Sequence, residues 1–314
     1  MAINLRRLRA FVTVAETRSV TLAAQRMHLT PPAVTKGVRE LEVELGVELF
    51  RRTASGMFLT SSGEAYHLHA RKALAELERG REEVRLITGG AGGRVRLGAT
   101  SETTMHVLPI ALGRLIEQRP QIEVSMAGSV FDTLVSEVRT GKIDFFLGVV
   151  PPDGLSSDLV AEPLYADEVQ VIARRGHPLA RRKKLKLADL GPYRWALSVS
   201  RGPIDRMLRA SYEQQGLEFP ENSIVIMPLT PMRSILSHSN LIAAATRVRM
   251  MEEAELGQLV ALPLYLPETR HVVSIVRGRE DYLSPWAKEL IALLRQVAAE
   301  CHVAVSHAHA PMKP

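Results

Sequence analysis

Three polar side chains, Thr35, Lys36 and Arg39, share one face of a segment that can form an amphipathic helix. At 100° per residue, the apolar side chains fall on the opposite face, namely Val34, Val38, Leu41 and Leu45. Hydroxyl, ammonium and guanidinium groups can hydrogen-bond base edges and pair with phosphates. This face therefore predicts contact with nucleic acid, although a helix face exposed only to solvent has the same spacing.

Hydroxyl side chains stand at three places where a predicted strand gives way to a helix. They suggest a ligand site built from Thr100, Ser101, Ser129 and the turn at Arg201 and Gly202. Helix starts present unpaired N–H groups and favour anions, so we expect a small, anionic ligand. Large apolar residues could form the wall of this site, namely Phe131, Phe146 and Met232. Ordinary helix capping is the alternative interpretation of the hydroxyl groups.

The sequence contains none of the usual catalytic motifs. G-x-S-x-G, the G-x-x-x-x-G-K phosphate loop and H-E-x-x-H are all absent, so we expect no enzyme activity and no cofactor. The single cysteine, Cys301, offers no disulfide or zinc cluster. His307 and His309 lack acidic or cysteine neighbours, so no metal site is expected.

Composition and charge are those of a globular, basic protein. The chain has 314 residues, which is enough for about two domains, with 46% hydrophobic residues and a net charge of +6. Residues 1–60 hold nine basic and five acidic side chains, a bias that favours nucleic acid at this end. We expect a cytoplasmic protein without membrane contact, because neither a signal peptide nor a long apolar run is visible.

The polar face belongs to the third of three short helices. Helical spacing begins at Leu5, resumes over residues 21–27, and starts again at Pro31 after Thr30, a residue that can cap a helix. Residues 46–60 then form a turn and two short strands around Ala54-Ser55-Gly56. Together these elements predict a helix-turn-helix at residues 20–39 with an adjacent β-wing, whose Arg52 can enter a minor groove.

A long helix is predicted from Ser61 to Ile87, because the segment lacks proline and repeats small or apolar residues at spacings of four and three. A pair of such helices would form a dimer through Ala73, Leu77, Gly80 and Val84. Packing of the helix on its own domain is the alternative. Residues 89–93, rich in glycine, predict a hinge.

From residue 94 onward, strands and helices alternate, which predicts an open α/β sheet with parallel strands. Strands are expected at 94–99, 122–126, 143–148, 167–173, 193–198, 223–227, 240–245 and 271–276, and helices at 105–119, 131–139, 204–215, 229–237 and 285–303. A dense basic run at residues 174–186 could contact DNA, but we interpret it as a solvated loop.

The N-terminal segment contains a set of distinctive motifs: A-A-Q-R-M-H-L-T-P-P-A-V-T at 23–35, E-L-G-V-E-L-F at 44–50, Arg52-Thr53 and Leu59-Thr60. These motifs resemble those of the LysR-type transcriptional regulators. The resemblance is dense over residues 3–65 and extends more loosely along the chain. Pro31 stands where the family usually has a glutamine, and Ser55 where a second basic wing residue is common. Base contacts at these two points are therefore not implied.

The resemblance implies a domain order. A winged helix-turn-helix occupies residues 1–60, a linker helix 61–88, a hinge 89–93 and an effector-binding domain 94–303, followed by a disordered tail at 304–314. The last domain would have two lobes like type II periplasmic binding proteins, the first formed by 94–164 and 268–303 and the second by 165–267. Two crossover strands would join them. An enzyme or solute receptor on this fold is the alternative.

The resemblance also implies partners. Duplex DNA would be contacted by Pro31, Pro32, Thr35, Lys36, Arg39 and Arg52, and a metabolite would bind between the lobes. The protein would form homodimers and homotetramers, with RNA polymerase as a further candidate partner. Phe131-Asp-Thr-Leu134 and Val149-Val150 resemble the branch that responds to protocatechuate-type acids or sugars.

Overall fold

The computed structural model describes residues 4–87, 92–151, 153–197, 202–226, 229–280 and 283–301. Most of the predicted hinge, the predicted tail and Arg201 lie outside these ranges. The chain divides into two compact units, one formed by residues 1–91 with Ser136–Ile143 and one by the rest.

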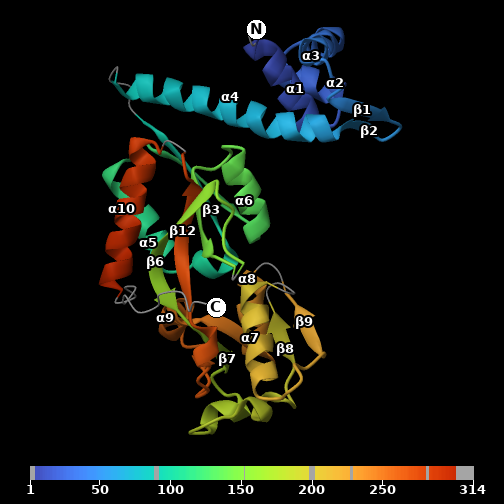
Figure 1. Cartoon of the computed structure of the whole chain (residues 1–314). Coiled ribbons are helices and arrows are strands. Elements are labelled where there is room, and N and C mark those ends of the chain that lie inside the picture. Colours follow the sequence, from blue (N-terminus) through green and yellow to red (C-terminus); the bar gives the residue numbers. More distant parts are fainter. Residues whose placement is uncertain are drawn as a thin grey trace. The chain divides into compact units, whose positions relative to one another are not determined.

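The N-terminal elements form the predicted helix-turn-helix and wing (Figure 1). The elements are α1 (Leu5–Thr17), α2 (Val20–Met27), α3 (Pro31–Leu45), β1 (Phe50–Thr53) and β2 (Gly56–Leu59). Phe11 and Val34 are fully buried in a core shared by the three helices and the wing. Ser19 accepts the Leu22 N–H and so fixes the start of α2.

The long helix α4 (Ser61–Ile87) is observed at its predicted residues. Its first turn lies so close to the preceding chain that a Cβ on Gly63 would meet the Leu49 carbonyl oxygen at 2.1 Å. Only glycine allows this approach. The approach brings Tyr66 and Ala70 into the same core as the helix-turn-helix.

The first lobe is built on a five-stranded sheet in the order β4-β3-β5-β12-β6. Its strands are β3 (Arg94–Ala99), β4 (Glu123–Gly128), β5 (Phe145–Val149), β6 (Leu159–Asp167) and β12 (His271–Gly278). β3 is parallel to β4 and β5, but β12 is antiparallel to β5 and β6. The predicted parallel pairing is observed for β3 with β4 and β5, whereas β12 is antiparallel because it returns from the second lobe in the opposite direction.

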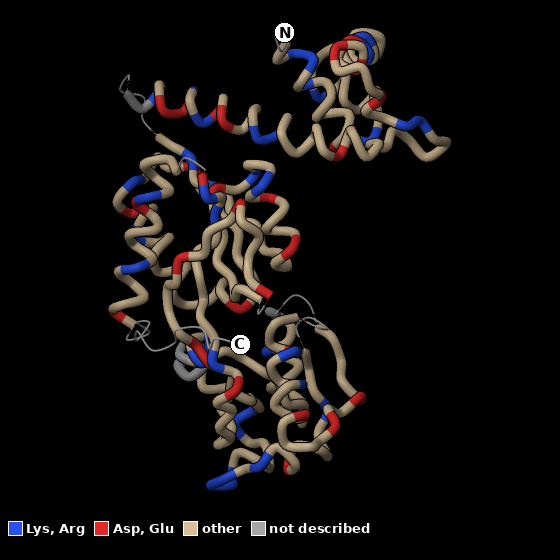
Figure 2. Tube along the Cα trace, in the orientation of Figure 1, with Lys and Arg blue, Asp and Glu red and all other residues tan. Residues whose placement is uncertain are grey.

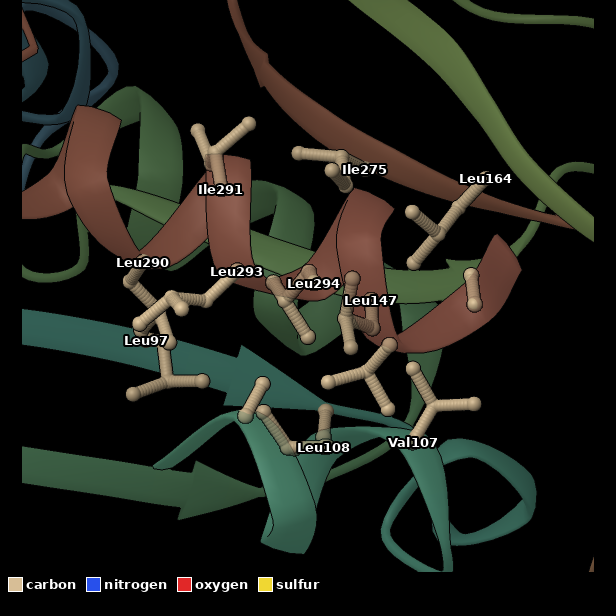
Figure 3. Close-up of a cluster of buried hydrophobic side chains, with 14 of the residues drawn as sticks. Leu97, Val107, Leu108, Leu147, Leu164, Ile275, Leu290, Ile291, Leu293 and Leu294 are labelled. Carbon is tan, nitrogen blue, oxygen red and sulfur yellow. The ribbon is translucent and has the colours of Figure 1, made fainter. Parts of the chain in front are cut away.

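Helices cover this sheet and complete its core. They are α5 (Val107–Gln118), α6 (Phe131–Arg139) and α10 (Pro285–Glu300), with a short 3₁₀ helix η1 (Ser101–Thr103). Figure 3 shows α10 packing its Leu290 and Leu294 toward Leu97, Leu108 and Leu147. Because these side chains are almost fully buried, the core holds the loops at the strand ends on a rigid base.

The second lobe has a mixed sheet in the order β11-β7-β10-β8-β9. Its strands are β7 (Val169–Arg174), β8 (Trp195–Leu197), β9 (Ser223–Val225), β10 (Ile242–Thr246) and β11 (Leu259–Ala261). Its helices are α7 (Pro203–Gln214), α8 (Leu229–Ser237) and α9 (Arg247–Leu256), with 3₁₀ turns η2 (Pro178–Arg181), η3 (Leu187–Leu190) and η4 (Pro267–Thr269). Here too β7 is antiparallel to its neighbours β10 and β11.

In the part of the chain that the structure describes, no helix combines the length and the apolar character needed to cross a membrane.

Candidate nucleic-acid and ligand sites

The two ends of α3 are defined by its capping residues. Thr30 is extended before the helix, and Pro31 occupies the first turn. The Thr30 carbonyl accepts the N–H groups of Ala33 and Val34, whereas its hydroxyl makes no capping hydrogen bond. At the other end, Gly46 has a φ of 71° and closes the helix.

The outer face of α3 presents the residues that the sequence singled out. Pro31, Pro32, Lys36 and Arg39 are exposed and Thr35 is half-buried. They line a groove of about 870 Å³ together with Arg7, Val20, Thr21, Glu40, Val43, Glu44 and Arg52. The structure therefore brings five residues of α3 and the wing arginine to one concave surface, and adds Arg7 and Thr21, which periodicity alone did not identify.

The groove is positively charged, because its lining includes four cationic residues and only two acidic ones, Glu40 and Glu44. Glu40 accepts Arg7 at 2.9 Å and lies 3.9 Å from the Lys36 ammonium. The Lys36 side chain is 78% exposed. Among the described residues, neither Arg39 nor Arg52 forms an ion pair. These cations can meet an incoming phosphate without first losing a strong partner.

The wing is fixed to the turn before α2. The Met57 N–H donates to the Arg18 carbonyl at 2.9 Å, and Arg52 lies opposite Met57 in the β1–β2 ladder. Gly56 has a φ of 130°, which an L side chain would strain. Ser55, at the tip, hydrogen-bonds Thr53. The exposed Arg52 is therefore carried by a hairpin whose direction is set by backbone contacts.

The apolar stripe of α4 divides into two parts. Ala70 is buried in the N-terminal core, whereas Leu77 and Val84 are 46% and 59% exposed. Ala73 and Gly80 are exposed as well, and nothing lies within 4 Å of a Cβ built on Gly80. The four residues predicted to form a dimer thus present an open, apolar surface.

In the first lobe, backbone hydrogen bonds bring two predicted ligand residues to the same sheet edge. The Thr100 N–H donates to the Leu147 carbonyl at 3.0 Å, and the Ser129 N–H donates to the Ala99 carbonyl at 3.2 Å. The Thr100 hydroxyl is buried and has no hydrogen-bond partner among the described atoms. Gly148, which the sequence did not single out, leaves space beside the Thr100 methyl group.

The predicted start of a full helix at Ser101 is not observed. Ser101 begins a 3₁₀ helix of only three residues, and α5 starts later, at Val107. No side chain caps this short helix, and the Thr103 hydroxyl instead donates to the Thr100 and Leu147 carbonyls. The dipole of a full helix therefore does not arise at Ser101.

The apolar residues predicted to form a wall of the ligand site lie in different environments. Phe131 and Phe146 meet edge to face, with ring centroids 5.2 Å apart, beside the same strand ends. Met232 is 1% exposed in a core cluster of the second lobe. Gly202 precedes α7 in extended conformation, while Arg201 lies outside the described residues. The roles of these residues toward a ligand remain predictions.

A buried titratable pair lies where the crossover strands pass between the lobes. Asp167, at the end of β6, is the register partner of His271, at the start of β12. The Asp167 carboxylate accepts the Glu168 and Val248 N–H groups. Burial nevertheless raises the pKa of Asp167 above its ordinary value, because desolvation penalises the charged form more than these contacts favour it.

The described residues contain no group of three or more His, Cys, Asp or Glu side chains that could hold a metal ion. Cys301 instead contacts His106, with 3.3 Å between Sγ and Nε2.

Two family models match the chain. The model described as "Bacterial regulatory helix-turn-helix protein, lysR family" covers residues 5–64, and the "LysR substrate binding domain" covers residues 88–299. The HTH-type transcriptional regulator GalR of Pseudomonas putida is 35% identical over 295 residues, which is 94% of this chain and 74% of that protein. The regulator PcaQ of Agrobacterium fabrum is 32% identical over 177 residues, 56% of this chain and 57% of that protein.

Solved structures share the fold. A full-length variant of OxyR from Pseudomonas aeruginosa superposes with a TM-score of 0.72 at 21% identity, covering 99% of this chain and all of that one. CbnR in complex with its target DNA has a TM-score of 0.66 at 20% identity, with 94% of this chain and 100% of that chain covered.

Proposed function

Since the chain belongs to the LysR family of bacterial transcription regulators, we propose that it recognises an operator in duplex DNA through α3 and the wing. The exposed Lys36 and Arg39 would meet the major groove, and Arg52 an adjacent minor groove. One observation carries this proposal, namely the shared concave surface that these residues line. The structure of CbnR with its target DNA, on the same fold, supports it.

A second part of the proposal concerns control by a metabolite. We infer that a small, anionic molecule binds at the strand ends of the first lobe and against the start of α7. The buried, unpartnered Thr100 hydroxyl supports a polar contact there, and the Phe131–Phe146 pair supports an adjacent apolar wall. Such a ligand would shift the equilibrium between two arrangements of the regulator by its differential affinity for them.

The third part concerns assembly. The open stripe formed by Ala73, Leu77, Gly80 and Val84 supports pairing of α4 with its copy in a homodimer. A dimer places two recognition helices on two half-sites of one operator. Association into homotetramers and contact with RNA polymerase extend the same proposal.

A gel shift with the DNA upstream of the protein's own gene tests the function. We expect a shifted band that a scrambled duplex of equal length and composition does not compete away at moderate salt. Equal competition by both duplexes would contradict operator recognition. A thermal-shift screen of metabolites then tests control, because a ligand that binds only the folded state raises stability by RT ln(1 + [L]/Kd).

A further inference from the structure

A turn in the second lobe carries the densest positive charge in the sequence. Between β7 and η3 the chain exposes six cations and no carboxylate, and we call these six the basic turn: Arg175, Arg181, Arg182, Lys183, Lys184 and Lys186. Figure 2 shows this blue stretch at the lower end of the view, at the yellow-green segment of Figure 1. The sequence alone suggested a solvated loop here.

The structure shows an anchored turn. Leu179, Leu185 and Leu187 flank the cations and are buried in the core of the second lobe. His177 is fully buried, its Nδ1 accepts the Leu179 N–H, and its Nε2 lies 3.2 Å from the Asn240 carbonyl. The cations are therefore held in place by the fold, so little backbone entropy is lost when they bind a partner.

Most of this charge is not neutralised by the protein. Arg182 pairs with Asp189 at 2.8 Å. Within the described part of the chain, Arg175, Arg181, Lys183 and Lys184 form no ion pair. Like charges held together on one turn repel each other and cost stability. A polyanion would relieve this repulsion.

The surface around the turn indicates which polyanion fits. Within the basic turn itself the large hydrophobic side chains are buried, namely Leu179, Leu185 and Leu187, and the exposed Leu256 and Tyr265 lie beside the turn. A protein partner would need apolar or aromatic anchors at the centre of the contact, whereas a phosphate backbone needs only positioned cations. We propose that the basic turn is a second DNA-binding surface, which contacts phosphates outside the operator half-sites. This inference rests on the proposed operator binding by α3.

The test uses the full chain, an operator-length duplex and a duplex several times longer that contains the same operator. The basic turn is neutralised by Arg181→Gln, Lys183→Gln and Lys184→Gln. The matched control is Arg114→Gln, Arg119→Gln and Arg295→Gln, which changes the net charge equally but removes cations already paired with Glu300, Glu289 and Glu162. Affinity for both duplexes is measured over a series of KCl concentrations.

We expect the parent and the control to bind the longer duplex more tightly and with a steeper salt dependence. Each phosphate contact adds about 0.9 to the slope of log K against log salt. The neutralised turn should lower that slope by roughly two to three on the longer duplex and leave operator-length binding unchanged. A neutralised variant that matches the control on the longer duplex would overturn the proposal. Failure of operator recognition by α3 would be distinguishable from failure of the proposal about the basic turn. In the first case the parent itself would not prefer the operator to a scrambled duplex.

Discussion

The backbone N–H of Met57 lies 2.9 Å from the carbonyl oxygen of Arg18, and this hydrogen bond attaches the wing to the turn between α1 and α2. The neighbouring Gly56 makes the contact possible, because a Cβ there would lie 2.7 Å from the same oxygen. The direction in which Arg52 projects therefore depends on two backbone atoms and the absence of a side chain.

Gly56→Ala should displace the wing and weaken operator binding. Both the positive φ and the clash with the Arg18 carbonyl oppose the substitution, at a cost of about 1–3 kcal/mol. Gly46→Ala is the matched control, since its φ is also positive but nothing lies within 4 Å of the added Cβ. Urea unfolding should show both variants destabilised, whereas DNA titration should show a large loss of affinity only for Gly56→Ala. Equal affinities of the two folded variants would mean that the wing does not contribute.

Leu77→Asp should disrupt the dimer. The substitution places a charge in the centre of the open stripe on α4, and burying an unpaired charge costs several kcal/mol. Leu68→Asp introduces the same charge at another exposed leucine of α4, outside the stripe. Sedimentation should show smaller species for Leu77→Asp than for Leu68→Asp, with weaker binding to a two-half-site operator. Identical sedimentation would assign assembly to another surface.

Thr100→Val should weaken metabolite binding and leave folding intact. The hydroxyl has no partner among the described atoms, and its isosteric replacement costs the protein no hydrogen bond. A ligand found by thermal shift should lose about 0.5–1.5 kcal/mol of affinity if it bonds this hydroxyl as a neutral group, and more if it is charged. Thr100→Ser retains the hydroxyl and should bind like the parent. Unchanged affinity of Thr100→Val in calorimetry would remove Thr100 from the site.

Asp167→Asn should alter the pH dependence of stability. Burial raises the folded-state pKa of Asp167 above the unfolded value, so its favourable contribution is complete below the unfolded pKa. It is lost as the pH rises through the folded pKa. Above that range Asp167→Asn should lose less stability than the parent, while Asp153→Asn, at an exposed position, should follow the parent. Parallel curves for all three proteins in urea unfolding would contradict a raised pKa.

Much of the local structure could be predicted from residue spacing. The helices α6 and α8 begin and end at the predicted residues, and α3 buries Val34, Val38 and Leu41 as its periodicity indicates. The antiparallel direction of β12 could not be predicted in this way. Alternation shows which residues share a face, but β12 acquires its antiparallel partners only through the return of the chain from the second lobe.

Some elements were not predicted, among them the nine-residue strand β6, which contains Pro163. α9 lacks a regular apolar stripe, and β11 has only three residues. At Ser101 the same hydroxyl pattern suits a helix cap and a 3₁₀ turn, so spacing could not distinguish them. For the α3 groove, the sequence identified the exposed cations of α3 and the wing. It did not identify Arg7, because Arg7 joins the groove through ion pairs with Glu40 and Glu44, which are 33 residues or more away in the sequence.

The central claim is that Arg39 and Lys36 on α3 contact the operator DNA. The most direct test is the affinity of the parent, Arg39→Ala and Lys36→Ala for an operator and a scrambled duplex at several salt concentrations. Arg9→Ala, which removes a cation of α1 paired with Glu78, is the control. A side chain that contacts guanine should cost about 1–3 kcal/mol on the operator alone, and one that contacts phosphate should weaken both duplexes and lower the salt slope by about one. If both α3 variants bind both duplexes like the parent at every salt concentration, α3 is not the DNA-reading helix.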